Sequence, residues 1–197
     1  MVIPNKFYHI YNRGNNRQKI FYSRENYLYF LRKVKRHFTA HLDILAYCLM
    51  PNHFHFLINT KENVASDAFS NDLKVMLRSY TRAINNQEGR LGSLFQQHTK
   101  IKLLGESNHS THPMTQSHRM SSSDSDLYPL VCFHYIHQNP MKAKLVDRME
   151  DWEMSSFKDY GGLRNGKLCN KDLAKELLDI PILPEMFYAE AYKVIIY

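Results

Sequence analysis

Cysteine is scarce in this chain of 197 residues. The three cysteines, Cys48, Cys132 and Cys169, lie far apart, and none forms a CxxC pair. This spacing argues against both a disulfide framework and a thiolate zinc site. We therefore interpret the cysteines as small core side chains and expect a reducing compartment, the cytoplasm.

Long apolar runs are also missing. No stretch approaches the roughly 18 apolar residues that would indicate a membrane span, and the first residues contain no apolar region typical of a signal peptide. The zinc-protease pattern HExxH is absent, and no cysteine stands at zinc-finger spacing from a histidine. These absences leave a globular protein with no predicted membrane partner.

Positive charge is in excess, with a formal net charge of +7 and a sequence pI of about 9.2. A basic protein favours polyanionic partners, and here we place nucleic acid ahead of a membrane surface. The length fits one domain with a sizeable core.

Hydrophobic periodicity predicts the secondary structure of the first half. Alternation indicates strands, and apolar residues three and four positions apart indicate helices. Ser23 is a suitable helix N-cap, and Pro51-Asn52 separates two apolar runs as the turn of an antiparallel hairpin would. The expected order is a strand at 7–14, a helix at 23–38, strands at 43–50 and 53–60, a helix at 65–86 and a strand at 98–104.

The second half begins with a polar, low-complexity segment, residues 105–126, which we interpret as a flexible surface insertion. A helix should follow from Asp126 and end near Asn139, because Pro140 disfavours the helical conformation of the residue before it. A short amphipathic helix fits 170–179. This order predicts an α+β protein of the ferredoxin-like kind, an antiparallel sheet with its helices on one face.

The stretch Leu49–Leu57, LMPNHFHFL, contains two histidines on a predicted strand. Alternate side chains of a strand share a face, so His53 and His55 point to one side and Phe54 and Phe56 to the other. Two imidazoles roughly 7 Å apart along a strand could converge on a divalent metal. From the pattern alone, two solvated histidines remain the simpler interpretation.

Other histidine pairs compete for a metal role. Two pairs have helical spacing, His37 with His41 and His134 with His137. The first fits a solvated helix end. Three more histidines fall in the polar segment, where solvation is the simpler reading: His109, His112 and His118.

Tyr135 and Asn139 form a second group, because a spacing of four residues places them on one helix face. A tyrosine hydroxyl with its usual pKa of about 10 is a poor nucleophile unless a cation polarises the electrophile or a base takes its proton. A metal bound by two imidazoles and one amide oxygen would keep positions open for phosphate oxygens. Lys142 and Lys144 follow and could bind backbone phosphates. From composition alone, a structural role is the simpler interpretation of one tyrosine among 13.

Five segments together resemble one family. YNRGNNRQKIF, AYCLMPNHFHFLI, LGSLFQ, YIHQNPMKAKLV and WEMSSFKDY occur in this order, and they resemble the REP-associated tyrosine transposases, a branch of the single-tyrosine HUH transposases. The resemblance covers about residues 5–162 without the polar segment, so we divide the chain into a transposase domain at 1–162 and an extension at 163–197.

The resemblance implies a ferredoxin-like HUH nuclease that acts on single-stranded DNA. His53 and His55 would be metal ligands with Asn139 as the third, and the cofactor would be Mg²⁺ or Mn²⁺. Tyr135 would be the nucleophile that forms a 5′-phosphotyrosine and releases a 3′-OH. The expected substrate is single-stranded DNA that carries a hairpin, of the REP or inverted-repeat kind, and a monomer is favoured over a dimer.

Several basic and polar residues are candidates for DNA contacts, most of which would bind phosphates without reading sequence. They form a stripe on the second helix, a loop after the first strand and the end of the tyrosine helix: Lys74, Arg78, Arg82, Arg13, Asn15, Asn16, Arg17, Lys142 and Lys144.

The chain departs from the family pattern at His137, where relatives often have Glu, and at MKAKL, which replaces a more usual VRAGL. Neither change removes a proposed ligand or the nucleophile. Two other functions stay open: a catalytically silent protein that binds DNA hairpins, and a metal-dependent hydrolase that uses water in place of Tyr135.

Overall fold

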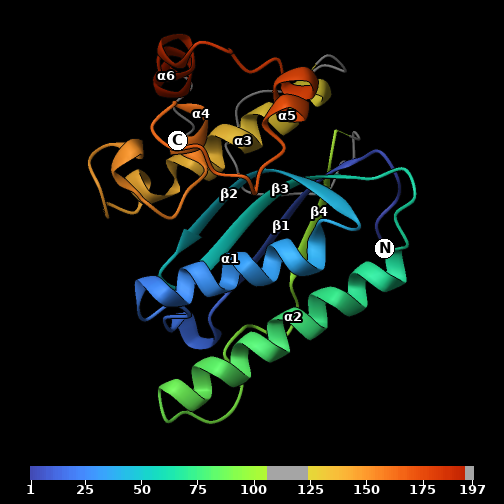
Figure 1. Cartoon of the computed structure of the whole chain (residues 1–197), viewed down its shortest axis with the longest axis vertical. Coiled ribbons are helices and arrows are strands. Elements are labelled where there is room, and N and C mark those ends of the chain that lie inside the picture. The colour runs from blue at the N-terminus through green and yellow to red at the C-terminus, as the bar shows by residue number, and fades with distance from the viewer. Residues whose placement is uncertain (106–123, 194–197) are drawn as a thin grey trace.

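A computed structural model describes residues 1–105 and 124–193 of the chain (Figure 1). Most of the polar segment predicted at 105–126 lies outside these residues, including His109, His112 and His118. No helix in the described ranges is long and apolar enough to cross a membrane.

Four antiparallel strands form a single sheet in the order β2-β3-β1-β4. This order and the succession β1-α1-β2-β3-α2-β4 are those of a ferredoxin-like fold, so the predicted class is confirmed. All four predicted strands are present, within one or two residues of their expected ends: β1 Phe7–Arg13, β2 Leu42–Met50, β3 His53–Thr60 and β4 Lys100–Leu104.

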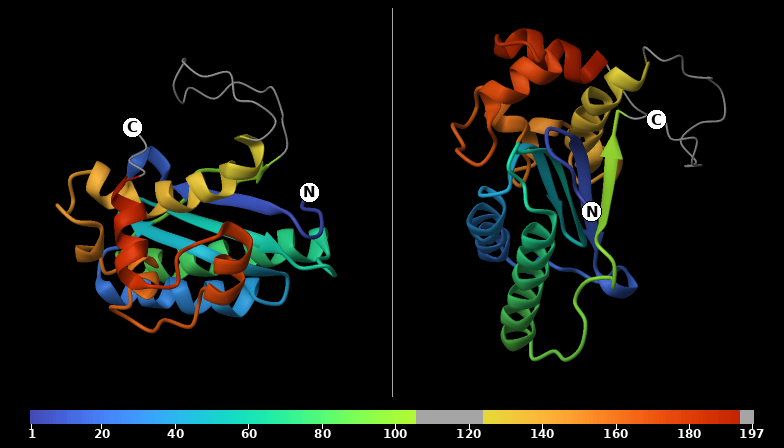
Figure 2. Two further views of the ribbon diagram at one scale, coloured as in Figure 1. Left: turned by 90° about the horizontal axis from the view of Figure 1, so that it is seen from above. Right: turned by 90° about the vertical axis from the view of Figure 1, so that its right-hand side faces the viewer.

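Helices α1 (Arg24–Phe38) and α2 (Ser66–Gln87) cover one face of the sheet (Figures 1 and 2). Ser23 begins α1 with a capping box that Asn26 completes, since the side-chain oxygen of Asn26 accepts the backbone N–H of Ser23 at 3.1 Å. The apolar stripes of both helices are buried against the side chains that alternate on this face, Phe54 and Phe56 among them.

The prediction that the helices lie on one face is wrong for the second half of the chain. Helix α3 (Asp124–Lys142) packs on the opposite face, against β2 and β3. The reason lies in β2, whose side chains are apolar on both faces of the sheet. Burying both sets of side chains requires a packed layer on each face. The remaining helical segments lie on that side as well: η2 Met149–Asp151, α4 Phe157–Tyr160, α5 Lys171–Leu178 and α6 Pro184–Lys193.

Helix α3 does not end at Asn139, as predicted, but continues through Pro140 to Lys142. Near a helix end, proline removes a single hydrogen bond while its fixed φ remains helical. The turn after it is closed by the N–H of Ala143, which donates to the carbonyl of Asn139 at 2.9 Å, and by Leu145, which donates to Pro140 at 3.0 Å. Lys144 then leaves the helix with φ of 56°.

The C-terminal residues share a hydrophobic core with the tyrosine helix. Phe187, Leu178 and Ala174 are buried in the same cluster as Phe133 and Ile136 of α3. The predicted division at residue 162 remains a prediction, but side chains on both sides of it are buried together. Helix α5 confirms the amphipathic helix predicted at 170–179.

A candidate active site between the sheet and helix α3

The two histidines of β3 lie on the sheet face opposite α1 and α2. His53 pairs with Arg13 and His55 with Tyr11 in the register of β3 and β1, and Tyr11 pairs in turn with Lys100 of β4. Residues paired across strands share a face, so these side chains form one surface. The predicted alternation is therefore observed, with Phe54 and Phe56 fully buried on the other face.

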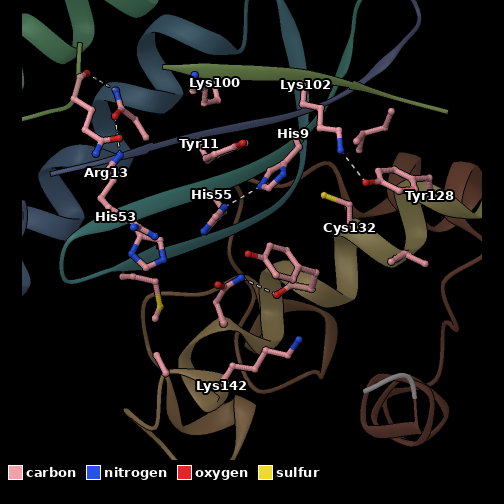
Figure 3. Close-up of a pocket in the computed structure, with 18 of the residues that line it drawn as sticks. His9, Tyr11, Arg13, His53, His55, Lys100, Lys102, Tyr128, Cys132 and Lys142 are labelled. Carbon is pink, nitrogen blue, oxygen red and sulfur yellow. Dashed lines mark hydrogen bonds between the residues drawn. The ribbon is translucent and has the colours of Figure 1, made fainter. Parts of the chain in front are cut away.

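Helix α3 crosses this surface and encloses a cavity of about 710 Å³ (Figure 3). His53, His55, Tyr135 and Asn139 all line it. The ring of Tyr135 stands edge-on to that of His55, with 5.8 Å between the ring centres. Two residues of β3 and two of α3, at least 80 positions apart in the sequence, thus meet in one cavity, as the sequence hypothesis requires.

His53 has one ring nitrogen free for a ligand. Its Nδ1 lies 2.6 Å from the side-chain oxygen of Asn52, which can only accept a hydrogen bond. Nδ1 therefore carries the proton, and Nε2 keeps its lone pair. Burial, with a smaller contribution from Arg13, lowers the pKa of His53 to about 4, so the ring is neutral at physiological pH.

His55 is held by a third histidine that the sequence reasoning did not single out. Nδ1 of His55 lies 2.8 Å from Nε2 of His9 on β1, and both side chains are buried. Burial lowers the pKa of His9 to about 3 and that of His55 well below its usual value. If the Nδ1–H of His55 donates to His9, then Nε2 of His55 is free to bind a ligand.

Tyr135 and Asn139 are linked along the helix. The amide nitrogen of Asn139 donates to the backbone carbonyl of Tyr135 at 2.8 Å. This hydrogen bond does not use the amide oxygen of Asn139. Tyr135 is half-buried, and burial raises its pKa. The phenol therefore stays protonated at neutral pH. The ammonium group of Lys142 lies 5.6 Å from the centre of its ring.

These donors fit a divalent metal in chemistry: two imidazole Nε2 atoms and one amide oxygen, each with its other polar atom already engaged. Within residues 1–105 and 124–193, no three His, Cys, Asp or Glu side chains are grouped as a metal site. A metal at this position would therefore depend on Asn139, or on water and substrate oxygens, beyond the two histidines.

A family model described as "Transposase IS200 like" matches residues 3–113, more than half of the sequence. The chain belongs to this family. The match includes His9, His53 and His55 and ends before helix α3, so it does not reach Tyr135 or Asn139. No curated protein matches the sequence.

Among solved structures, this member of the IS200-like family is similar to a REP-associated tyrosine transposase bound to a REP hairpin. The two share 20% sequence identity with a TM-score of 0.55, over 83% of this chain and 84% of the other. The likeness extends past the family match and shows a shared fold. The resemblance inferred from the five segments is thus confirmed as family membership and fold.

The cavity of this transposase-family protein is basic. Four cations line it, two of them predicted, Arg13 and Lys142, and two missed, Lys100 and Lys102 of β4. Among the lining residues that the structure describes, none is acidic. The alternation of Lys100 and Lys102 in the sequence shows that they share a face, but only the sheet register shows which one.

The other predicted DNA-contact residues lie outside this cavity. Lys74 and Arg78 line a second cavity beside α2, whereas Arg82 lines neither. The short helix η1 (Asn15–Arg17) consists of three exposed residues, Asn15, Asn16 and Arg17. Lys144 is also exposed and follows α3. None of these four residues lines either cavity. Their contacts with DNA remain predictions.

The competing histidine pairs have structural partners. His41 of the first pair lies 2.8 Å from Asp72 and His37 lies 3.7 Å from it, which ties the end of α1 to α2. In the second pair, His134 is 3.0 Å from Glu190 and His137 is 2.7 Å from the hydroxyl of Ser156. His137 is buried away from the cavity, so the departure from the family pattern at this position lies in the core.

Proposed function

We propose that this protein is a metal-dependent transposase that cleaves and rejoins single-stranded DNA through a covalent bond to Tyr135. The single observation that carries the proposal is the meeting of Tyr135 with His53 and His55 in one basic cavity. Membership of the IS200-like family and the shared fold with a REP-associated tyrosine transposase support it.

The positions of the side chains support a reaction in which Tyr135 is the nucleophile. The hydroxyl oxygen of Tyr135 attacks the phosphorus and its proton passes to solvent. The bond from phosphorus to the 3′ oxygen breaks, and this leaving oxygen takes a proton from solvent. The products are a 5′-phosphotyrosine and a 3′-hydroxyl, and a second 3′-hydroxyl can reverse the step to rejoin a strand. Arg13, Lys100 and Lys142 hold the phosphates on either side of the reacting one.

His53, His55 and Asn139 would hold Mg²⁺ or Mn²⁺. When bound, the ion supplies positive charge that stabilises the reacting phosphate. The chain itself fixes the two imidazoles through Asn52 and His9 and presents them unprotonated. A nitrogen-containing ligand set favours Mn²⁺ over Mg²⁺ in affinity, while abundance favours Mg²⁺.

The substrate we propose is single-stranded DNA with a hairpin near the cut. The similar solved structure contains a REP hairpin, and the cavity, whose described lining residues include four cations and no acid, fits a phosphate backbone. We also propose a monomer, because one chain supplies all four of the central side chains.

The test is incubation with end-labelled single strands that carry candidate hairpins, with Mn²⁺ and without it. The wild type should form an adduct that survives denaturation, and Tyr135→Phe should not. Tyr11 is the rival nucleophile, because its ring lies 5.7 Å from that of His55 in the same cavity. The exposed Tyr22 supplies a surface control, Tyr22→Phe.

Three outcomes would contradict the proposal in different ways. An adduct that persists in Tyr135→Phe and disappears in Tyr11→Phe would reassign the nucleophile. Cleavage that survives both changes would identify a hydrolase that uses water. Hairpin binding without cleavage in any divalent metal would identify a silent DNA-binding protein.

A further inference from the structure

A second cavity of about 500 Å³ opens on the other face of the sheet, beside α2. Its lining residues come mainly from this helix and from residues 93–99, in the segment that returns from the end of α2 to β4. Figure 2 shows the course of that segment. Lys74 and Arg78, one helical turn apart and both exposed, lie on its helix side. Leu73, Leu77 and Ile101 give it an apolar part.

The two cavities are neighbours. Asn12, Gln96 and His98 line both of them, so the segment at 96–98 forms the border that the two share. Gln96 and His98 are exposed there, whereas Asn12 is buried.

This border is held in place by hydrogen bonds. The amide nitrogen of Asn12 donates to the carbonyl of Gln96 at 3.2 Å and to the hydroxyl of Thr99 at 2.8 Å. The N–H of Gln96 donates to the carbonyl of Arg13 at 2.8 Å. A surface fixed in advance loses little conformational entropy when a ligand crosses it.

The charge pattern continues from one cavity to the next. In the described part of the chain, no acidic side chain lines either cavity. The second cavity combines two cations with amide, hydroxyl and apolar groups, and the exposed Gln97 and His98 stand at its edge. Proteins that bind single-stranded nucleic acid combine basic groups that follow the backbone with rings on which bases stack. The exposed imidazole of His98 is such a ring here.

We propose that the second cavity binds the unpaired DNA strand that adjoins the cleaved bond. The strand leaves the cavity of Tyr135, passes over residues 96–98 and reaches Lys74 and Arg78, which bind its phosphates. This inference rests on the proposed function. A duplex fits the path poorly, because DNA with a persistence length of about 150 base pairs resists a turn around one strand of a sheet.

The experiment compares oligonucleotides by fluorescence anisotropy over a series of salt concentrations. One is a minimal hairpin with the unpaired nucleotides around the cut, and two others extend it by about eight unpaired nucleotides, on the 5′ or the 3′ side, within the site size of single-strand binders. Wild-type protein should bind one of the extended strands more tightly than the minimal one.

The double variant Lys74→Gln/Arg78→Gln should lose this gain and keep its affinity for the minimal strand. Its salt dependence on the extended strand should weaken by about 1.4 in the slope of log K against log salt, since each phosphate contact to a single strand contributes about 0.7. The matched control is Lys35→Gln/Arg36→Gln, which removes the same charge from exposed positions of α1 that line neither cavity.

The outcomes separate this inference from the proposed function. If the double variant keeps the whole gain and melts like the wild type, the second cavity is not the binding site, while adduct formation by Tyr135 can still stand. If a paired extension gives the same gain as an unpaired one, the partner is duplex DNA and the inference is wrong. If the wild type binds none of the strands and forms no adduct, the proposed function itself fails.

Discussion

Nε2 of His9 and Nδ1 of His55 lie 2.8 Å apart, and this contact joins strands β1 and β3 inside the wall of the larger cavity. One of the two nitrogens must donate and the other accept, so the position of the proton on His55 depends on His9. In the proposal His9 binds neither the phosphate nor the metal, although its ring stands edge-on to that of Tyr135, with 6.1 Å between the ring centres. It positions the ligand nitrogen of His55.

His9→Ala should therefore weaken Mn²⁺ binding by about 10- to 100-fold, the usual effect of removing a residue that orients a metal ligand. His9→Gln, whose amide oxygen can accept from His55, should recover part of the loss. Calorimetric titration of Mn²⁺ into the DNA-free protein measures both. His98→Ala is the control, since His98 is an exposed imidazole in the same cavity wall. Unchanged affinity in His9→Ala would remove His9 from the site.

The stability of the metal-free protein should fall as the pH drops below about 6.5, the ordinary pKa of histidine. His9 is neutral when folded because burial, and then Lys102, lower its pKa to about 3, but it binds a proton once unfolded. The unfolded state therefore holds more protons between these two values, and stability rises with pH across that window. Each such group contributes a slope of up to about 1.4 kcal/mol per pH unit.

The variant His9→Gln should flatten this dependence between about pH 6 and pH 4, relative to the wild type. Denaturant unfolding in EDTA at several pH values provides the free energies. A slope that is the same in both proteins would show that His9 is already charged in the folded state.

His137 provides a test of the family departure. It is fully buried among Phe133, Phe157 and Tyr160, and its Nε2 lies 2.7 Å from the hydroxyl of Ser156. Removing one partner of a buried hydrogen bond costs about 1–3 kcal/mol. His137→Ala should therefore lower the free energy of unfolding by about this amount, while the folded fraction still forms the adduct. Loss of the adduct at full folding would place His137 in the reaction.

Local patterns were sufficient to predict the sheet strands and helices α1 and α2, because alternation and helical periodicity are written in neighbouring residues. The same alternation placed His53 and His55 opposite Phe54 and Phe56 correctly. His9 was missed because its partner is 46 residues away and only the register of β1 with β3 brings them together. A lone histidine on a strand carries no local signal for such a pairing.

The helix end at Asn139 was misjudged for a related reason. The rule that proline stops a helix weighs local sterics, but Pro140 is itself buried by the tertiary structure, which continues α3 to Lys142. The apolar side chains of β2 are buried on both faces of the sheet, so a second layer must pack on the face opposite α1 and α2. The periodicity within α3 does not show that α3 forms this layer.

Asn139 has a structural role and a proposed role as metal ligand, and its variants should distinguish the two. Its amide nitrogen supports the helix end by donating to the carbonyl of Tyr135, and its oxygen is the proposed third ligand. Asn139→Asp keeps a ligand oxygen, adds charge and loses the donor, so Mn²⁺ binding should be retained or tightened while the melting temperature falls. Asn139→Leu loses both groups and should weaken metal binding and stability together.

Calorimetric Mn²⁺ titration and thermal melting of the two Asn139 variants, in the absence of DNA, separate the ligand from the helix end without relying on activity. Equal metal affinity in Asn139→Leu and the wild type would show that the two imidazoles and water suffice. In that case the amide of Asn139 would serve only to shape the backbone at Tyr135, four residues before it, and the third ligand would have to come from water or from the oxygens of the DNA itself.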